Sequence, residues 1–116
     1  MRISGTVLLP ADAPPFASAT LHVRLLDASL ADAPSVVLAE QTIPGVNRTD
    51  RTEQSVRFTL SAELPAGWTG SLIVAAHLDL VGDLRVHAGD LLSTASHPVP
   101  ATGAADVVVP LEVIRS

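Results

Sequence analysis

Residues 54–61 read Gln-Ser-Val-Arg-Phe-Thr-Leu-Ser, and apolar and polar side chains alternate along them without a break. One face carries Val56, Phe58 and Leu60, and the other carries Arg57 and Thr59. A period of two residues is that of a β-strand with one face buried and one face in water. The stretch therefore predicts a half-buried strand, and it sets the pattern that the rest of the chain follows.

The same alternation, bounded by Pro, Gly and Asp, extends the strand prediction in both directions. We expect strands at 2–9, 19–27, 36–43, 71–80 and 106–114, with shorter ones around 84–86 and within 91–97. The polar residues 46–53 are typical of a mobile loop. Pro110 lies inside the last strand and indicates an edge position or a bulge, because proline cannot donate to a sheet hydrogen bond.

These strands predict an all-β protein, a two-sheet antiparallel sandwich of about seven to eight short strands. The length of 116 residues suits one domain over 1–116. The alternative is an α/β fold with a helix within 28–40 or 71–80. Clustered Val and Ile, Pro34 and the absence of helix caps disfavour this alternative.

Composition excludes several classes of function. The net charge is −5, and all seven basic residues are arginines scattered along the chain, so we expect no nucleic-acid binding. No apolar run approaches the roughly 20 residues needed to span a bilayer. The chain has no cysteine, which excludes disulfides. Without a leader or a lipobox cysteine the sequence as given predicts a cytoplasmic protein; a periplasmic or outer-membrane-associated one is expected if it is a piece of a longer chain.

An acidic stretch offers a candidate metal site. Asp79, Asp83 and Asp90 fall at positions 1, 5 and 12 of a calcium loop. Val81 at position 3 and Leu84 in place of the glycine at position 6 depart from that motif. The interpretation favoured by the sequence is a turn at 82–83 and a solvated Asp79, so we expect no cofactor, with calcium as the alternative.

Four histidines, His22, His77, His87 and His97, lack the paired spacings of a metal site. His22 and His77 lie on predicted strands and can share a face, but solvated or singly bonded histidines on wet sheet faces are the simpler expectation. The wet face of 19–27, with His22 and Arg24, is a candidate interaction surface. No nucleophile elbow or phosphate loop occurs, which predicts that the protein is not an enzyme.

Residues 23–34, VRLLDASLADAP, lead into 36–43, VVLAEQTI. This block resembles the YbaY/YscW-like bacterial lipoprotein family, which includes the pilotins of type III secretion. Residues 3–7 are similar to that family's first strand, and 89–98 to its late D-x-x-x-T-x-x-x-P region. The resemblance implies a β-sandwich of about seven strands without enzymatic activity, and in the pilotin branch a protein that binds a segment of its secretin.

We therefore expect a non-catalytic protein-interaction module that takes a partner's strand or helix, such as a secretin-like peptide, at a sheet edge or an apolar face. Strand 106–114 and the face with His22 and Arg24 are the regions to test. The second hypothesis is a calcium- or metal-stabilised structural domain that uses the 79–90 loop. A small-ligand binder or enzyme, which needs a deep pocket lined by His22, His77 and acids, is the third. The oligomeric state is left open.

Overall fold

The computed structural model describes residues 1–29, 36–49, 52–93 and 97–114. Within these ranges the chain forms nine β-strands and no α-helix, which confirms the all-β prediction. They are β1 (Arg2–Leu9), β2 (Phe16–Asp27), β3 (Val36–Arg48), β4 (Gln54–Ser61), β5 (Leu72–Asp79), β6 (Leu91–Leu92), β7 (His97–Val99), β8 (Ala104–Pro110) and β9 (Glu112–Val113). No helix able to cross a membrane is found in the described part of the chain.

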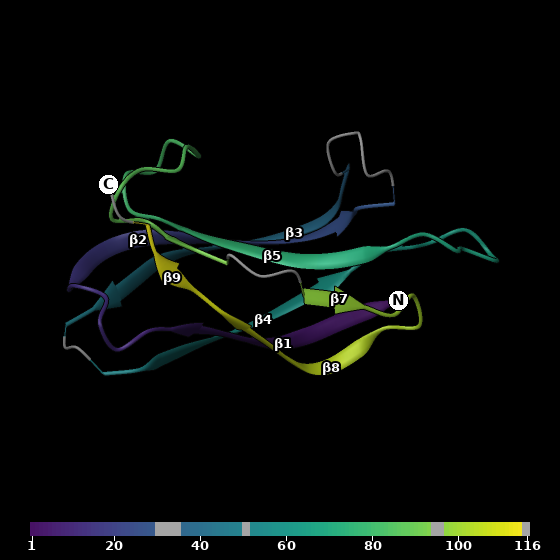
Figure 1. Ribbon diagram of the computed structural model, residues 1–116, viewed down its shortest axis with the longest axis horizontal. Coiled ribbons are helices and arrows are strands. Elements are labelled where there is room, and N and C mark those ends of the chain that lie inside the picture. The colour runs from purple at the N-terminus through teal and green to yellow at the C-terminus, as the bar shows by residue number, and fades with distance from the viewer. Residues whose placement is uncertain (30–35, 50–51, 94–96, 115–116) are drawn as a thin grey trace.

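The strands form two sheets that lie face to face (Figure 1). The smaller sheet has the order β4-β1-β8, and the larger has the order β3-β2-β5-β6-β9 with β7 also paired to β5. One described pair departs from the antiparallel prediction, because β8 runs parallel to β1. The chain reaches β8 from β7 in the opposite sheet, and such a crossing connection does not impose the antiparallel direction that a hairpin does.

The inward faces of both sheets close one aliphatic core. In β1 every second residue, including Val7 and Leu9, is fully buried, and Val23 and Leu25 of β2 face them from the other layer. Apolar area removed from water stabilises a fold by roughly 25 cal/mol per Å². The residues of this continuous core come from both sheets and include Ile3, Leu21, Phe58, Leu60, Leu72, Val74, Leu78, Leu91, Val109 and Leu111.

The last part of the chain joins the two sheets. β8 forms an edge of the smaller sheet and ends at Pro110, and β9 then pairs with β6 in the larger sheet. Figure 1 shows this crossing in yellow. At the crossing point, the N–H of Leu111 still donates to the carbonyl of Leu8 at 2.9 Å. The edge position predicted from Pro110 is confirmed, but 106–114 is two strands instead of one.

Three local predictions were wrong or incomplete. β3 continues to Arg48, so the loop expected from residue 46 begins later; Val46 and Arg48 are buried opposite Ala19 and Phe16 of β2. Residues 84–86 do not form a strand: 84 and 85 are bends, and 86 has no regular structure. Within 91–97 only residues 91–92 and 97 are in strands, and 94–96 lie outside the described residues.

Candidate functional site

The segment 80–89 connects β5 to β6, and its first residues are held by Asp79 at the end of β5. The Asp79 carboxylate accepts backbone N–H donors from Val81 at 3.1 Å, Gly82 at 2.8 Å and Leu84 at 2.8 Å. Leu84 has a positive φ of 66°, which bends the backbone so that its N–H faces the carboxylate. One side chain therefore organises the first half of the segment.

Asp79 is only 1% exposed, which corrects the expectation of a solvated carboxylate. Burial raises the pKa of Asp79, but the hydrogen bonds from Gly82, Leu84 and Val81 favour the charged form and together outweigh it. The pKa of Asp79 consequently lies below the ordinary value for aspartate. The carboxylate is held in its ionised form inside the protein.

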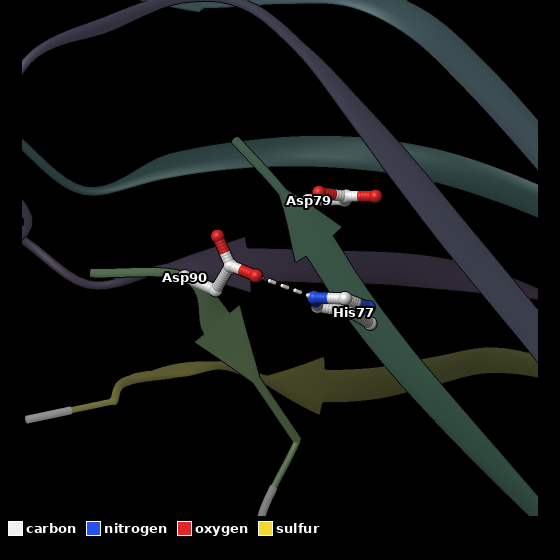
Figure 2. A group of neighbouring side chains, drawn as sticks. All are labelled: His77, Asp79 and Asp90. Atoms are coloured by element: carbon white, nitrogen blue, oxygen red, sulfur yellow. Dashed lines mark hydrogen bonds and ion pairs between the residues drawn. The ribbon is translucent and has the colours of Figure 1, made fainter. Parts of the chain in front are cut away.

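Asp90 fastens the other end of the same segment. Its Oδ1 accepts the N–H of Leu80 at 3.1 Å, and its Oδ2 accepts the N–H of His87 at 3.1 Å. The same Oδ2 lies 2.9 Å from Nε2 of His77 (Figure 2). Asp90 is 1% exposed, so a second buried carboxylate is satisfied by backbone donors and one imidazole.

Two histidines from neighbouring strands complete the arrangement. His22 of β2 and His77 of β5 lie directly opposite each other in the sheet, and their ring centroids are 6.2 Å apart. His22 Nε2 is 4.0 Å from Asp79 Oδ2. One ligand atom from each of His77, Asp79 and Asp90 lies within 4.8 Å of the others (Figure 2). We call these four residues, His22, His77, Asp79 and Asp90, the imidazole–carboxylate cluster.

Asp83, the third acid of the predicted calcium set, lies outside this cluster. Its carboxylate contacts His87 Nε2 at 2.8 Å, and the side chains of both residues are largely exposed. Their hydrogen bond raises the pKa of His87 and lowers that of Asp83. The structure thus brings Asp79 and Asp90 together with two histidines and leaves Asp83 in a separate surface pair.

The face of β2 that carries His22 and Arg24, predicted to lie in water, is only partly exposed to solvent. Arg24 is partly exposed and forms an ion pair with Glu40 of β3. His22, two residues earlier, is 6% exposed, which corrects the expectation that it faces solvent. A shallow hollow of about 110 Å³ lies on this face, with Leu26, Ala75 and Leu92 among its lining residues beside the histidines.

The hollow does not meet the condition for the ligand-binding or enzymatic reading. Small-molecule sites typically enclose about 300–1,000 Å³, which is well above this volume. His22 and His77 reach its wall, but Asp79 and Asp90 are not among its lining residues. The acids needed beside an open position are instead bonded to the backbone of 80–87.

Strand assignment alone could pair the two histidines, but it could not predict their burial. The alternation in 71–80 places His77 and Asp79 on the face opposite Leu78, and a single sandwich leaves that face in water. The conformation of segment 80–89 depends on hydrogen bonds between aspartate side chains and backbone N–H groups up to ten residues apart. The available signal was the short Asp- and Gly-containing run 79–83, which is typical of side-chain-to-backbone turns.

Comparison with solved structures finds the same fold in one pilotin of a bacterial secretion system. The structure of an alternative pilotin from the type II secretion system of Vibrio cholerae matches with a TM-score of 0.67 at 22% identity, covering 97% of this chain and 96% of the other. No curated protein sequence matches the chain. The model of the type III secretion system lipoprotein chaperone family (YscW) matches residues 1–102. The chain belongs to this family.

Proposed function

We propose that the protein is a non-catalytic chaperone that binds a segment of a secretin, the outer-membrane channel protein of a secretion system. The match of residues 1–102 to the secretion chaperone family carries the proposal. The sandwich fold and its similarity to a pilotin support it. A chaperone of this kind needs a surface for a partner and no reacting groups.

The outer face of the larger sheet is the surface we assign to the secretin segment. Its hollow is bordered by the apolar side chains of Leu26, Ala75 and Leu92, and the Arg24–Glu40 ion pair lies beside it. A peptide that lays an apolar side chain into the hollow gains burial there. A polar or charged peptide residue next to that side chain can interact with Arg24 or Glu40, and this interaction fixes the orientation of the peptide.

Substitution of Ala75 by arginine tests this assignment. Ala75 is half-buried at the hollow, and a long charged side chain there fills the space and places an unpaired charge against the peptide. We expect Ala75→Arg to weaken binding of a C-terminal secretin peptide by about tenfold or more, the equivalent of about 1.4 kcal/mol. The measurement is fluorescence anisotropy of the labelled peptide.

Ala105→Arg is the matched control, because Ala105 is exposed on β8 in the opposite sheet. This variant should bind as the unmodified protein does. Equal weakening by both substitutions would remove the outer face from the proposal. Absence of binding by the unmodified protein, under conditions in which an established pilotin–secretin pair binds, would reject the function itself.

A further inference from the structure

The imidazole–carboxylate cluster concentrates negative charge inside the protein. Asp79 and Asp90 are each 1% exposed. Asp79 lies beside His22 and Asp90 beside His77, and these two histidines are 6% and 8% exposed. In the described part of the chain, no arginine is paired with either carboxylate. Buried charges in proteins are paired with opposite charges or coordinate metals, since their desolvation is otherwise unfavourable.

The hydrogen bonds of the cluster leave ligand positions open. A carboxylate oxygen has about two lone-pair sites. Asp79 Oδ1 uses both for Val81 and Gly82, but Oδ2 accepts one backbone donor and turns its other side toward His22. On Asp90, Oδ2 accepts the N–H of His87 and meets His77 Nε2. One oxygen of each carboxylate can therefore take a ligand bond while its backbone bonds stay in place.

His22 is the observation that points to a missing ligand. Its side chain is 92% buried, as 8% of it is exposed, and no hydrogen bond is formed by its Nδ1. Its Nε2 is directed at Asp79 Oδ2 from 4.0 Å, which is too long for a hydrogen bond. A buried imidazole that stops short of a carboxylate has the position of a metal ligand, because an ion between the two atoms would bond to both.

We propose that His22, His77, Asp79 and Asp90 bind one divalent transition-metal ion, with Zn²⁺ as the best fit. Zn–N and Zn–O bonds of about 2.0–2.2 Å place tetrahedral ligands roughly 3.3–3.5 Å apart. The separations here are 2.9 Å for His77–Asp90 and 4.0 Å for His22–Asp79, and the atoms of His77, Asp79 and Asp90 lie within 4.8 Å of one another. His22 lies outside that group of three and approaches it through Asp79, so it is the ligand that has to move most to reach the ion.

The backbone of 80–87 supplies the support that such sites require. Metal-binding carboxylates are normally held by further hydrogen bonds that fix their orientation. Here the N–H groups of Val81, Gly82 and Leu84 hold Asp79, and those of Leu80 and His87 hold Asp90. The ion would fasten this segment to β2 and β5 through the two histidines.

The ligand set also changes the metal expected from the sequence. Calcium takes six to eight oxygen ligands, whereas two imidazoles and two carboxylates suit zinc and its neighbours. Asp83, the third acid of the calcium motif, is bonded to His87 at the surface. We therefore expect calcium to compete poorly with zinc.

Metal titration of the purified full chain, stripped with EDTA, tests the site. Isothermal titration with ZnCl₂ should give one site per chain, and CoCl₂ should give the intense visible absorption of tetrahedral Co²⁺. We expect His22→Gln to weaken Zn²⁺ binding by about tenfold or more and to weaken the Co²⁺ band. This variant keeps the fold, because His22 Nδ1 has no bond to lose and the segment 80–89 is held by other residues.

His87→Ala is the matched control, because it removes an exposed histidine of the same segment and leaves the backbone N–H that Asp90 accepts. It should bind Zn²⁺ as the unmodified protein does. No stoichiometric binding by the unmodified chain would overturn the proposal, and so would equal binding by His22→Gln with an unchanged Co²⁺ spectrum. Secretin binding is not measured in this experiment, so the metal site and the proposed chaperone function are tested independently.

Discussion

At the residue scale, a few aspartates decide the shape of one face. In segment 80–89, Asp90 accepts the backbone N–H groups of Leu80 and His87. Asp79 accepts N–H groups of residues between these two. Charge-assisted bonds to backbone N–H groups are roughly twice as strong as neutral ones. The segment can therefore stay folded with few apolar anchors, as the exposed side chains of Val81, Leu84 and Val86 show.

The Asp83–His87 pair gives a prediction about pH. The hydrogen bond that His87 donates to Asp83 is the main cause that raises the pKa of His87 above 6.5, and the charges of Asp83, Asp90 and Asp79 add to it. In an NMR titration with EDTA present, we expect a His87 pKa above 6.5. Asp83→Asn should move that pKa down toward 6.5, because both the charge and part of the hydrogen bond are lost.

The sign of the stability effect follows from both shifts. A raised pKa of His87 stabilises the fold fully at pH below 6.5, and this contribution is lost as the pH rises through the raised pKa. The lowered pKa of Asp83 adds stability above its ordinary pKa that is lost as the pH falls through the lowered one. Asp106→Asn, an exposed change on β8, should leave the His87 titration unchanged. A His87 pKa at or below 6.5 in the unmodified protein would contradict the pairing.

Individual site residues were only partly predictable from the sequence. Asp79, Asp83 and Asp90 formed the alternative calcium set, and the structure brings two of these three acids, Asp79 and Asp90, together. Their companions His22 and His77 were expected in solvent, because alternation assigns a strand residue to a face without saying whether that face is covered. The loop that holds Asp79 and Asp90 has positive φ at Gly82 and Leu84, which strand periodicity does not encode either.

At the scale of the elements, the parallel contact between β1 and β8 requires a glycine. A Cβ atom placed on Gly5 would lie 2.0 Å from the carbonyl oxygen of Val107 in β8. Gly5 is paired to Phe58 on one side and to Val107 on the other, so the backbone cannot move away from both strands together. The two neighbours can approach this closely only because the residue has no side chain.

Gly5→Ala should therefore destabilise the protein by about 1–3 kcal/mol, the usual effect of overpacking a close contact. The measurement is the urea dependence of the far-ultraviolet circular dichroism. Ser4→Ala, the neighbouring half-buried position of β1, is the control and should change stability by no more than about 0.5 kcal/mol. An equally stable Gly5→Ala variant would show that β8 does not lie against β1 as described.

The strands of eight residues were predictable from the sequence, and the two-residue strands were not. β1 and β4 have the bounds expected from their alternation, and β5 differs by one residue at each end. β6 and β9 have two residues each, too few for a period of two to be visible. Their pairing depends on where the chain crosses between sheets at Pro110, a tertiary feature that the sequence marks only as an irregularity.

For the molecule as a whole, both sheets share one core. The last two strands connect them, because β8 belongs to the smaller sheet and β9 to the larger. Leu111, 2% exposed, lies between β8 in the smaller sheet and β9 in the larger and belongs to the common core. Neither sheet has a separate apolar interior, since the buried apolar residues of both sheets belong to one cluster. The prediction of a single domain over 1–116 implies that the sheets unfold together.

Two probes can separate this behaviour from independent unfolding of the sheets. Trp68, the single tryptophan, lies between β4 and β5, where the chain passes from one sheet to the other, and it packs against the core. Far-ultraviolet circular dichroism reports the strands of both sheets. In urea, we expect the fluorescence of Trp68 and the dichroism to give the same midpoint.

Leu111→Ala sharpens the test, because truncation of a buried leucine destabilises a core by about 2–5 kcal/mol. If the core is common to both sheets, the variant lowers the midpoints of fluorescence and dichroism by the same amount and leaves the slope of each transition unchanged. Separation of the two midpoints, or a dichroism curve with two steps, would show that the sheets are held by separate cores. Coincident curves follow from a structure in which the buried apolar residues of β1, β4 and β8 belong to the same core as those of the larger sheet.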